Sequence, residues 1–424
     1  MDTSPGQTEG SAPPVAADGP VGTGWSTGGR MRRLPTTTFT AAIVAMAAVL
    51  VACAPAPAGP GTTTTTTVLT GTAPVVTSFT TPVASVTTPA LVPFSWTVAD
   101  PQGTPLTCTL DVEDDGDVEL TVPGCQGTRS RNLTVGTTGP IVVRLTVDDG
   151  SETTSATVAF SAAPGPTETY DVVLRPQSPL SPEAQTAFDD AGARWESVLV
   201  AGVPSASVSI GTNACGATNG ALSGVVDDVV IDISTTAIDG PNGVLARAGP
   251  CLIATVDGLA RFGVMEFDLA DIGDLVAGGT LDDVIVHEMG HVLGIGTLWD
   301  SVPTGSLITG VGTGDPRFLG ARAGAEWSAL GRTGTVPVEA TGGPGTADSH
   351  WRESVFGNEL MTGFINAGSN PLSRLTIASL ADLGYLVDLG AADAYSLPGG
   401  SLLSALRAPP VEFRSDLLGP VGAV

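Results

Sequence analysis

One stretch of the chain, residues 280–300, limits what the protein can fold into more than any other. It contains the pattern His-Glu-x-x-His, formed by His287, Glu288 and His291. A threonine suited to an N-cap and two aspartates precede the motif, and Gly294 follows it. Acidic residues stabilise the first turn of a helix, and glycine commonly ends one. The pattern therefore predicts a helix that begins near residue 280 and ends at Gly294.

Two histidines four positions apart lie on the same face of a helix. The imidazoles of His287 and His291 are therefore placed to bind one metal ion at about 2.0–2.1 Å. Glu288 lies about 100° around the helix axis, where its carboxylate reaches a water on the metal rather than the ion itself. The motif predicts a zinc hydrolase with Glu288 as the general base. The alternative is coincidence on an ordinary amphipathic helix, expected about once in a thousand chains with so few histidines.

The third metal ligand has to come from elsewhere in the chain. His350 is the remaining histidine, and it lies in the segment 345–363 together with Met361. Glu326 and Glu339 are the alternatives, because some zinc hydrolases take a downstream glutamate as their third ligand.

The two segments together resemble the leishmanolysin-like peptidases, a branch of the metzincin clan. Metzincins carry His-Glu-x-x-His-x-x-Gly-x-x-His, and this chain matches that pattern through Gly294 but has Thr297 in place of the last histidine. The leishmanolysin-like branch has an insertion there, followed by His-Trp and then Glu-Leu-Met, as found here at 350–351 and 359–361. The resemblance implies three zinc ligands, a general base and a Met-turn residue: His287, His291, His350, Glu288 and Met361.

The resemblance covers about residues 170–397 and is densest at the two metal segments. It implies an α+β metzincin-like domain over residues 166–397 that hydrolyses protein or peptide substrates with one zinc ion. In metzincins the strand before the zinc helix is a sheet edge that pairs with extended substrate. We therefore expect Gly263, Val264 and Met265 to bind substrate, although a plain interior strand is the alternative.

The N-terminal part of the chain has the features of an exported protein. Residues 1–30 predict disorder, or a mis-assigned start with translation beginning at Met31. Residues 31–52 have the pattern of a signal peptide, and Cys53 resembles the lipidated cysteine of a bacterial lipobox. Residues 53–74 then predict a tether. We expect a membrane-anchored lipoprotein at the cell surface, with secretion after ordinary cleavage, or a retained anchor helix, as the alternatives.

Residues 75–165 alternate apolar and polar side chains with the period of β-strands, as at Val92, Phe94 and Trp96. Short strands at this spacing predict a β-sandwich that resembles the immunoglobulin-like modules of bacterial surface proteins. The acidic turn at residues 111–117 resembles a calcium loop, but Val122 stands where the bidentate carboxylate is required. Calcium is therefore possible but unsupported, both here and at Asp268, Asp271 and Asp274, for which solvated carboxylates are the main interpretation.

With Cys53 assigned to a lipid, four cysteines are left. An exported protein folds in an oxidising compartment, so we expect disulfides within each domain rather than a free cysteine that blocks the metal. The members are Cys108 and Cys125 in the sandwich, and Cys215 and Cys251 in the next domain.

The chain has 424 residues, 43 acidic and 17 basic, for a net charge of -26. This charge argues against nucleic acid and against electrostatic binding to anionic membranes, because both require basic patches.

The patterns and the resemblance together predict a multidomain fold, with an all-β immunoglobulin-like sandwich, an α+β metzincin-like domain and a C-terminal tail at 398–424. The alternative function is a surface adhesin in which the sandwich binds a partner and the metal domain is not proteolytic.

Overall fold

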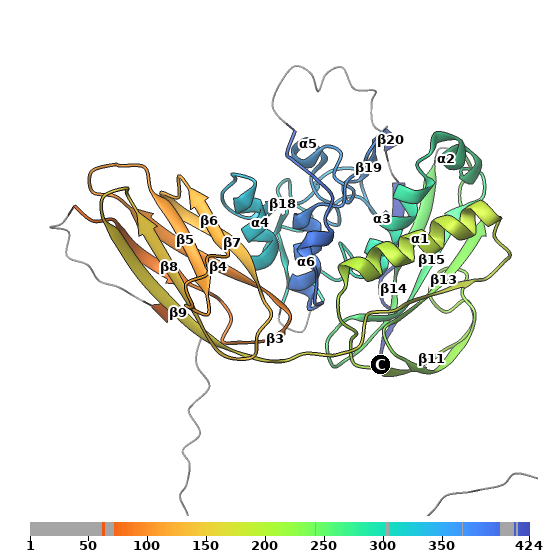
Figure 1. Cartoon of the computed structure of the whole chain (residues 1–424). Coiled ribbons are helices and arrows are strands. Elements are labelled where there is room, and N and C mark those ends of the chain that lie inside the picture. Colours follow the sequence, from red (N-terminus) through yellow and green to blue (C-terminus); the bar gives the residue numbers. More distant parts are fainter. Residues whose placement is uncertain are drawn as a thin grey trace, which may run out of the picture. The chain divides into compact units, whose positions relative to one another are not determined.

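The computed structural model of the chain is drawn in Figure 1. It describes residues 62–63, 72–241, 243–301, 305–366, 368–398, 411–412 and 414–424, all of which belong to the unit Pro55–Val424. The predicted disorder, the predicted signal peptide and Cys53 lie outside the described residues. None of the helices in the described part is long and apolar enough to cross a membrane.

The first part of the unit is built from two β-sheets around one apolar core. The strands of the first sheet and most strands of the second pair antiparallel with their neighbours in the same sheet. Phe79, Phe94 and Trp96 are fully buried in the core that the two sheets share. The alternation read from the sequence therefore marks the inward faces of real strands. The first sheet has the order β1 (Thr62–Thr63), β2 (Val75–Thr80), β4 (Ala90–Ala99) and β7 (Gly127–Val135). The second has the order β3 (Ser85–Thr88), β9 (Thr153–Pro164), β8 (Gly139–Asp148), β5 (Thr107–Val112) and β6 (Leu120–Pro123).

A third, mixed sheet packs against the helix with the metal motif. Its strands lie in the order β10 (Val172–Pro176), β13 (Val229–Thr236), β15 (Ala260–Asp268), β14 (Val244–Ile253) and β21 (Arg414–Leu417), and β22 (Gly422–Ala423) also pairs with β14. β10, β13 and β15 are parallel, whereas β14 is antiparallel to β15. The C-terminal strands β21 and β22 pair with the outer side of β14, and both are parallel to it.

This strand order corrects the prediction that Gly263, Val264 and Met265 form a sheet edge. They belong to β15, which has β13 on one side and β14 on the other, and every residue of β15 is buried. The main-chain groups of an interior strand are used by its neighbours, so none is left for substrate. Gly263 serves packing instead, because a Cβ there would lie 2.3 Å from Val292 Cγ1 on the helix with the metal motif.

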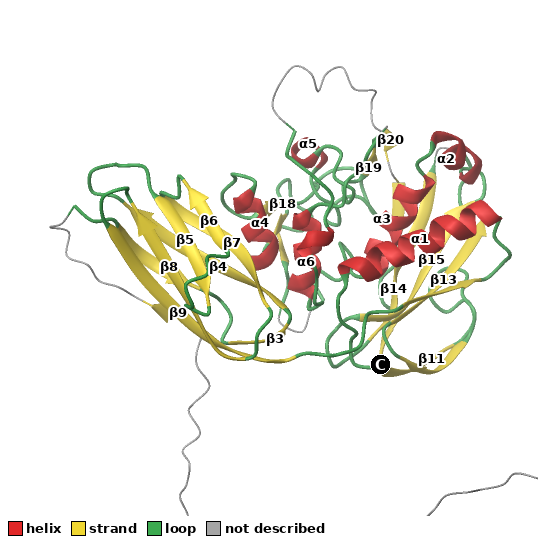
Figure 2. Ribbon diagram, viewed as in Figure 1, coloured by secondary structure: helices red, strands yellow, loops and turns green. Residues whose placement is uncertain are grey.

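Two helices pack together over this sheet (Figure 2). Helix α1 (Pro182–Val198) begins at the N-cap Ser181, whose hydroxyl accepts the Ala184 N–H at 3.2 Å. The Trp195 indole N–H donates to the Val286 carbonyl at 3.0 Å, in helix α3 (Leu281–Val292). This bond and the buried face of α1 fix the position of α3, which carries His287, Glu288 and His291.

The region after α3 is irregular, as its glycine content predicts.

Asp268, at the end of β15, is buried. It accepts the backbone N–H groups of Ala270, Ile238, Asp239 and Gly240, and these hydrogen bonds hold its pKa below the ordinary value. Asp271 is buried as well, so the prediction of solvated carboxylates is wrong for these two. The remaining elements are β11 (Ala206–Ile210), β12 (Leu222–Val226), α2 (Ile272–Gly278), β16 (Ile308–Thr309), β17 (Arg317–Phe318), α4 (Ala321–Ala329), β18 (Val336–Pro337), α5 (Glu353–Phe356), β19 (Phe364–Ile365), α6 (Arg374–Leu383), η1 (Leu389–Ala391) and β20 (Val411–Glu412).

Two disulfides are present in the described residues. Cys108 pairs with Cys125 inside the two-sheet module, and Cys215 pairs with Cys251 beside the mixed sheet. Each closes a loop within one part of the unit, which confirms the predicted pairing within domains.

Candidate metal centre

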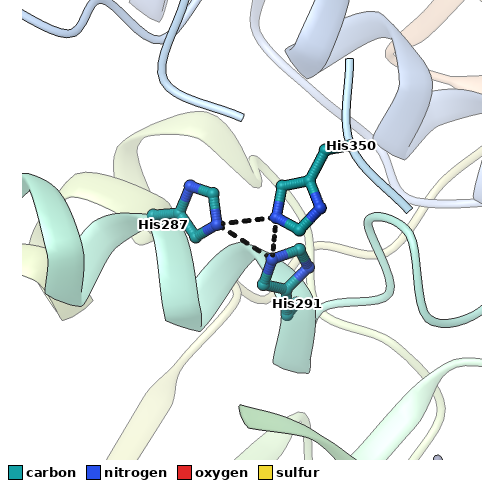
Figure 3. Close-up of side chains that lie close together, drawn as sticks. All are labelled: His287, His291 and His350. Carbon is teal, nitrogen blue, oxygen red and sulfur yellow. Dashed lines mark hydrogen bonds between the residues drawn. The ribbon is translucent and has the colours of Figure 1, made fainter. Parts of the chain in front are cut away.

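Three imidazoles from two distant segments meet at one point. His287 and His291 project from α3, and His350 comes from the segment before α5 (Figure 3). Their Nε2 atoms are 2.9 Å apart for His287 and His291, 3.0 Å for His291 and His350, and 3.1 Å for His287 and His350. All three side chains are fully buried. The structure thus brings together the three residues that the sequence resemblance named as ligands.

The other ring nitrogen of each histidine fixes which tautomer is present. The three Nδ1 atoms lie 2.8, 2.7 and 3.1 Å from main-chain carbonyl oxygens, those of Leu360, Ile295 and Thr346 in the order His287, His291, His350. A carbonyl only accepts, so each Nδ1 carries the proton and each Nε2 presents a lone pair. Three converging lone pairs repel one another unless a cation lies among them. Neutral imidazoles held in this way are a fitting ligand set for zinc.

Burial keeps these imidazoles in the form that binds a metal. Loss of hydration lowers the pKa of His287 and His291 well below the ordinary value, with a neighbouring imidazole as the second cause for each. The same two causes lower the pKa of His350 to about 3. The three ligands are therefore neutral across the physiological pH range.

Glu288 follows the first histidine and is fully buried. Neither of its carboxylate oxygens has a hydrogen-bond partner among the described residues. Burial raises the pKa of this carboxyl well above its ordinary value. A buried carboxyl without a partner is costly, and such groups are more frequent at functional sites than elsewhere in a fold.

Met361 is buried against the helix that carries the motif. A Cβ placed on Gly290, between the two histidines of α3, would lie 3.1 Å from Met361 Sδ. Met361 therefore packs against the turn of α3 that lies between His287 and His291 in the sequence. The backbone N–H of Met361 donates to Glu359 Oε2 at 2.7 Å, and Glu359 also accepts the hydroxyls of Ser373 and Thr376 on or beside α6.

Sequence reasoning had not singled out Glu359. It is fully buried, and its bonds join the Met361 segment to α6. The signal that could have found it is its position two residues before Met361, in the Glu-Leu-Met pattern that carried the resemblance.

The two glutamates considered as alternative ligands have other partners. Glu326 accepts from the Asn132 side-chain amide at 3.1 Å and pairs with Arg374 at 3.0 Å. Glu339 accepts the N–H groups of Ala340 and Thr341. Neither belongs to the group of side chains in the described structure that can hold a metal ion. His350 therefore supplies the third nitrogen.

One glycine lets the two metal segments approach each other. Gly296 has a φ of +77°, and a Cβ there would lie 2.2 Å from the carbonyl oxygen of Ser349, the neighbour of His350. We expect Gly296→Ala to cost about 1–3 kcal/mol in backbone strain and also to displace His350, which weakens zinc binding. Gly312→Ala is the matched control, since Gly312 has a φ of +72° but open space around it. Competition with a chromophoric chelator measures the zinc affinity, and equal affinities in the two variants would refute the close-approach argument.

Part of the chain matches a known protein family. Residues 212–402 match the family model described as leishmanolysin. Among solved structures, the chain is similar to the endo-beta-1,4-mannanase from Thermotoga petrophila, with 16% identity, a TM-score of 0.17, and coverage of 20% of this chain and 19% of that chain. A second is the PmoD soluble domain from Methylocystis sp., with 14% identity, a TM-score of 0.15, and coverage of 19% and 78%. Both similarities are too low to inform the fold or the function. The chain matches no curated protein.

Proposed function

Residues 212–402 are a leishmanolysin-family domain, and on that premise we propose that the protein is an exported zinc endopeptidase that hydrolyses internal peptide bonds. The observation that supports this most directly is the convergence of three Nε2 atoms within 3.1 Å of one another, two of them on the helix that also carries the buried Glu288. His287, His291 and His350 are the proposed zinc ligands, Glu288 the general base and Met361 the floor of the site.

The mechanism divides between the ion and the chain. When bound, zinc supplies a Lewis acid that lowers the pKa of water toward about 7 and polarises a peptide carbonyl. The three imidazoles would hold the ion without adding charge, and the carbonyl bonds at their Nδ1 atoms fix the orientation of the rings. Glu288 accepts a proton from the attacking water as its oxygen bonds to the carbonyl carbon. The carboxyl then gives this proton to the leaving nitrogen as the C–N bond breaks.

The environment of Glu288 suits both halves of this task. Burial raises the pKa of its carboxyl, so the proton is held between the two steps rather than lost to solvent. Both oxygens lack protein partners in the described structure, and they are therefore available to water and then to the amine.

The location of the protein forms a second part of the proposal. The two disulfides favour folding in an oxidising compartment, which agrees with the export signal read at residues 31–52. We assign residues 53–74 to a tether that begins at a lipidated Cys53, residues 75–165 to an immunoglobulin-like module and residues 166–397 to the peptidase domain. This arrangement would hold the peptidase outside the cell, where its substrates are proteins or peptides.

Casein is the test substrate, because a general endopeptidase cuts it at internal bonds. We expect fragments whose formation stops with a zinc chelator and resumes when zinc is restored, with cleavage sites identified by mass spectrometry. The adhesin alternative predicts no fragments. Absence of cleavage by the zinc-loaded chain, both as it stands and with its C-terminal segment released as described below, would refute the proposed activity.

A further inference from the structure

The last described residues of the chain pair with strands of the domain that carries the metal segments. We call residues 411–412 and 414–424 the C-terminal segment. Its first strand, β20, pairs antiparallel with β19, which begins three residues after Met361. Its next strands, β21 and β22, pair with β14, the outer strand that the mixed sheet would otherwise expose. The segment therefore joins the Met361 side of the metal centre to the far edge of the sheet.

The segment uses the main-chain groups of that edge. The N–H groups of Leu418, Val421 and Val424 donate to the carbonyls of Ala248, Cys251 and Ile253 at 2.9, 2.9 and 2.8 Å. An exposed strand edge is a template for an added strand, and extended peptides bind proteins in this way. With the segment in place, these acceptors on β14 are already used.

A glycine on β14 permits the contact. A Cβ on Gly249 would lie 1.8 Å from the carbonyl oxygen of Leu418. The backbone of Gly249 is not in the left-handed region, so the lack of a side chain serves close approach rather than conformation. The edge is thus shaped to let another backbone lie directly against it.

The same segment borders the surroundings of the metal. Leu417, Leu418 and Gly419 line a cavity of about 280 Å³ together with Gly296 and Ser349. Gly296 follows the helix of His291, and Ser349 precedes His350. The metal-binding side chains and Glu288 are fully buried in this arrangement, whereas an endopeptidase has to admit an extended polypeptide.

We propose that the C-terminal segment occupies, within its own chain, the sheet edge on which an extended substrate binds, so that the full chain is a latent form of the enzyme. This inference rests on the proposed function. The segment is suited to release, because β21 has four residues and β22 two, and the residues from Gly419 to Ala423 are exposed. Short pairings with exposed backbone open more readily than the rest of a fold.

The test keeps the full chain and weakens the attachment of the C-terminal segment to β14. The double variant Leu418→Pro with Val421→Pro removes two N–H donors to β14, and Pro420→Ala is the control, since Pro420 lies between them, is exposed and has no N–H to lose. We expect casein cleavage by the double variant to rise about tenfold or more, because a larger fraction of molecules has a free edge. A synthetic peptide of residues 411–424, added to the double variant, should inhibit it by raising KM without lowering kcat.

Two results would overturn the inference. One is an unchanged rate in the double variant with no inhibition by the peptide. The other is a lower rate together with a lower unfolding temperature, which would make the segment a permanent strand of the sheet.

A binding measurement decides the inference even if no protein cleaves casein. The same peptide with a fluorescent label should bind the double variant and be displaced by unfolded, carboxymethylated casein, as followed by fluorescence anisotropy. Displacement without cleavage would refute the proposed function but support a shared peptide edge. Failure of the labelled peptide to bind, or binding that casein leaves unchanged, would refute the shared edge.

Discussion

Replacement of Glu288 by glutamine is expected to lower kcat on casein by about 10²–10⁴-fold while the zinc content stays unchanged. Glutamine has nearly the same shape but cannot take a proton from water or return it to the leaving amine. The proposed ligands are His287, His291 and His350, so the substitution leaves the metal in place. Cleavage rates and elemental analysis on the same preparation measure both quantities.

The matched control for this variant is Glu183→Gln. Glu183 is an exposed residue in the first turn of α1, and its loss of charge should leave kcat within about twofold, as for ordinary surface substitutions. A Glu288→Gln protein that cleaves casein as fast as the parent would show that another group is the base. Loss of zinc along with activity would show that Glu288 acts as a ligand.

Removal of the metal is expected to destabilise the folded chain as well as to stop turnover. A ligand that binds the folded state adds RT ln(1 + [L]/Kd), about 4 kcal/mol at a zinc concentration a thousandfold above Kd. Without the ion, three buried Nε2 lone pairs face one another within 3.1 Å. We therefore expect the unfolding temperature to fall with a zinc chelator and to rise with added zinc, as measured by calorimetry.

His350→Ala serves as the control for this experiment. It removes one of the three nitrogens, so its unfolding temperature should respond weakly to zinc. Calcium should not replace zinc in the parent protein, because calcium prefers oxygen ligands and the site is made of nitrogens. An unfolding temperature that is the same with and without the chelator would contradict the assignment of a tightly bound ion.

Local spacing was sufficient to predict one half of the metal centre. His287, Glu288 and His291 lie within five residues, and helix geometry alone places the two imidazoles together. His350 is 59 residues beyond His291, and no local pattern joins them, so this prediction depended on the family resemblance. The structure brings His350 to the others through an irregular region whose close approach at Gly296 the sequence does not reveal.

The sheet order was harder to predict than its strands. The interior position of β15 follows from β14, which precedes it in the chain and pairs with its outer side. A strand buried on both faces commonly shows a continuous apolar run, but β15 carries Arg261, Glu266 and Asp268 although all its residues are buried, so its sequence does not indicate an interior position. Residues 398–424 were predicted to be a tail, whereas the C-terminal segment within them adds strands to the mixed sheet. Its strands of two to four residues are too short to show periodicity, and their partner β14 lies about 170 residues upstream.

Buried polar groups were predicted least well. Asp268 was predicted to be solvated because its neighbours in the sequence do not indicate that backbone N–H groups near residue 239 surround its carboxylate. Glu326 was considered as a ligand because only its residue type was visible, whereas its role is to join Asn132 and Arg374 from distant segments. Such partners depend on tertiary structure, which composition and spacing do not encode.

The central claim is that three histidines hold one zinc ion, and elemental analysis of the purified full chain tests it most directly. We predict about one zinc per chain in the parent and a large loss in His350→Ala, as expected for a site of three protein ligands. Zinc that stays at one per chain in His350→Ala would move the third ligand to another residue. Absence of zinc from the parent, after purification in its presence, would contradict the account.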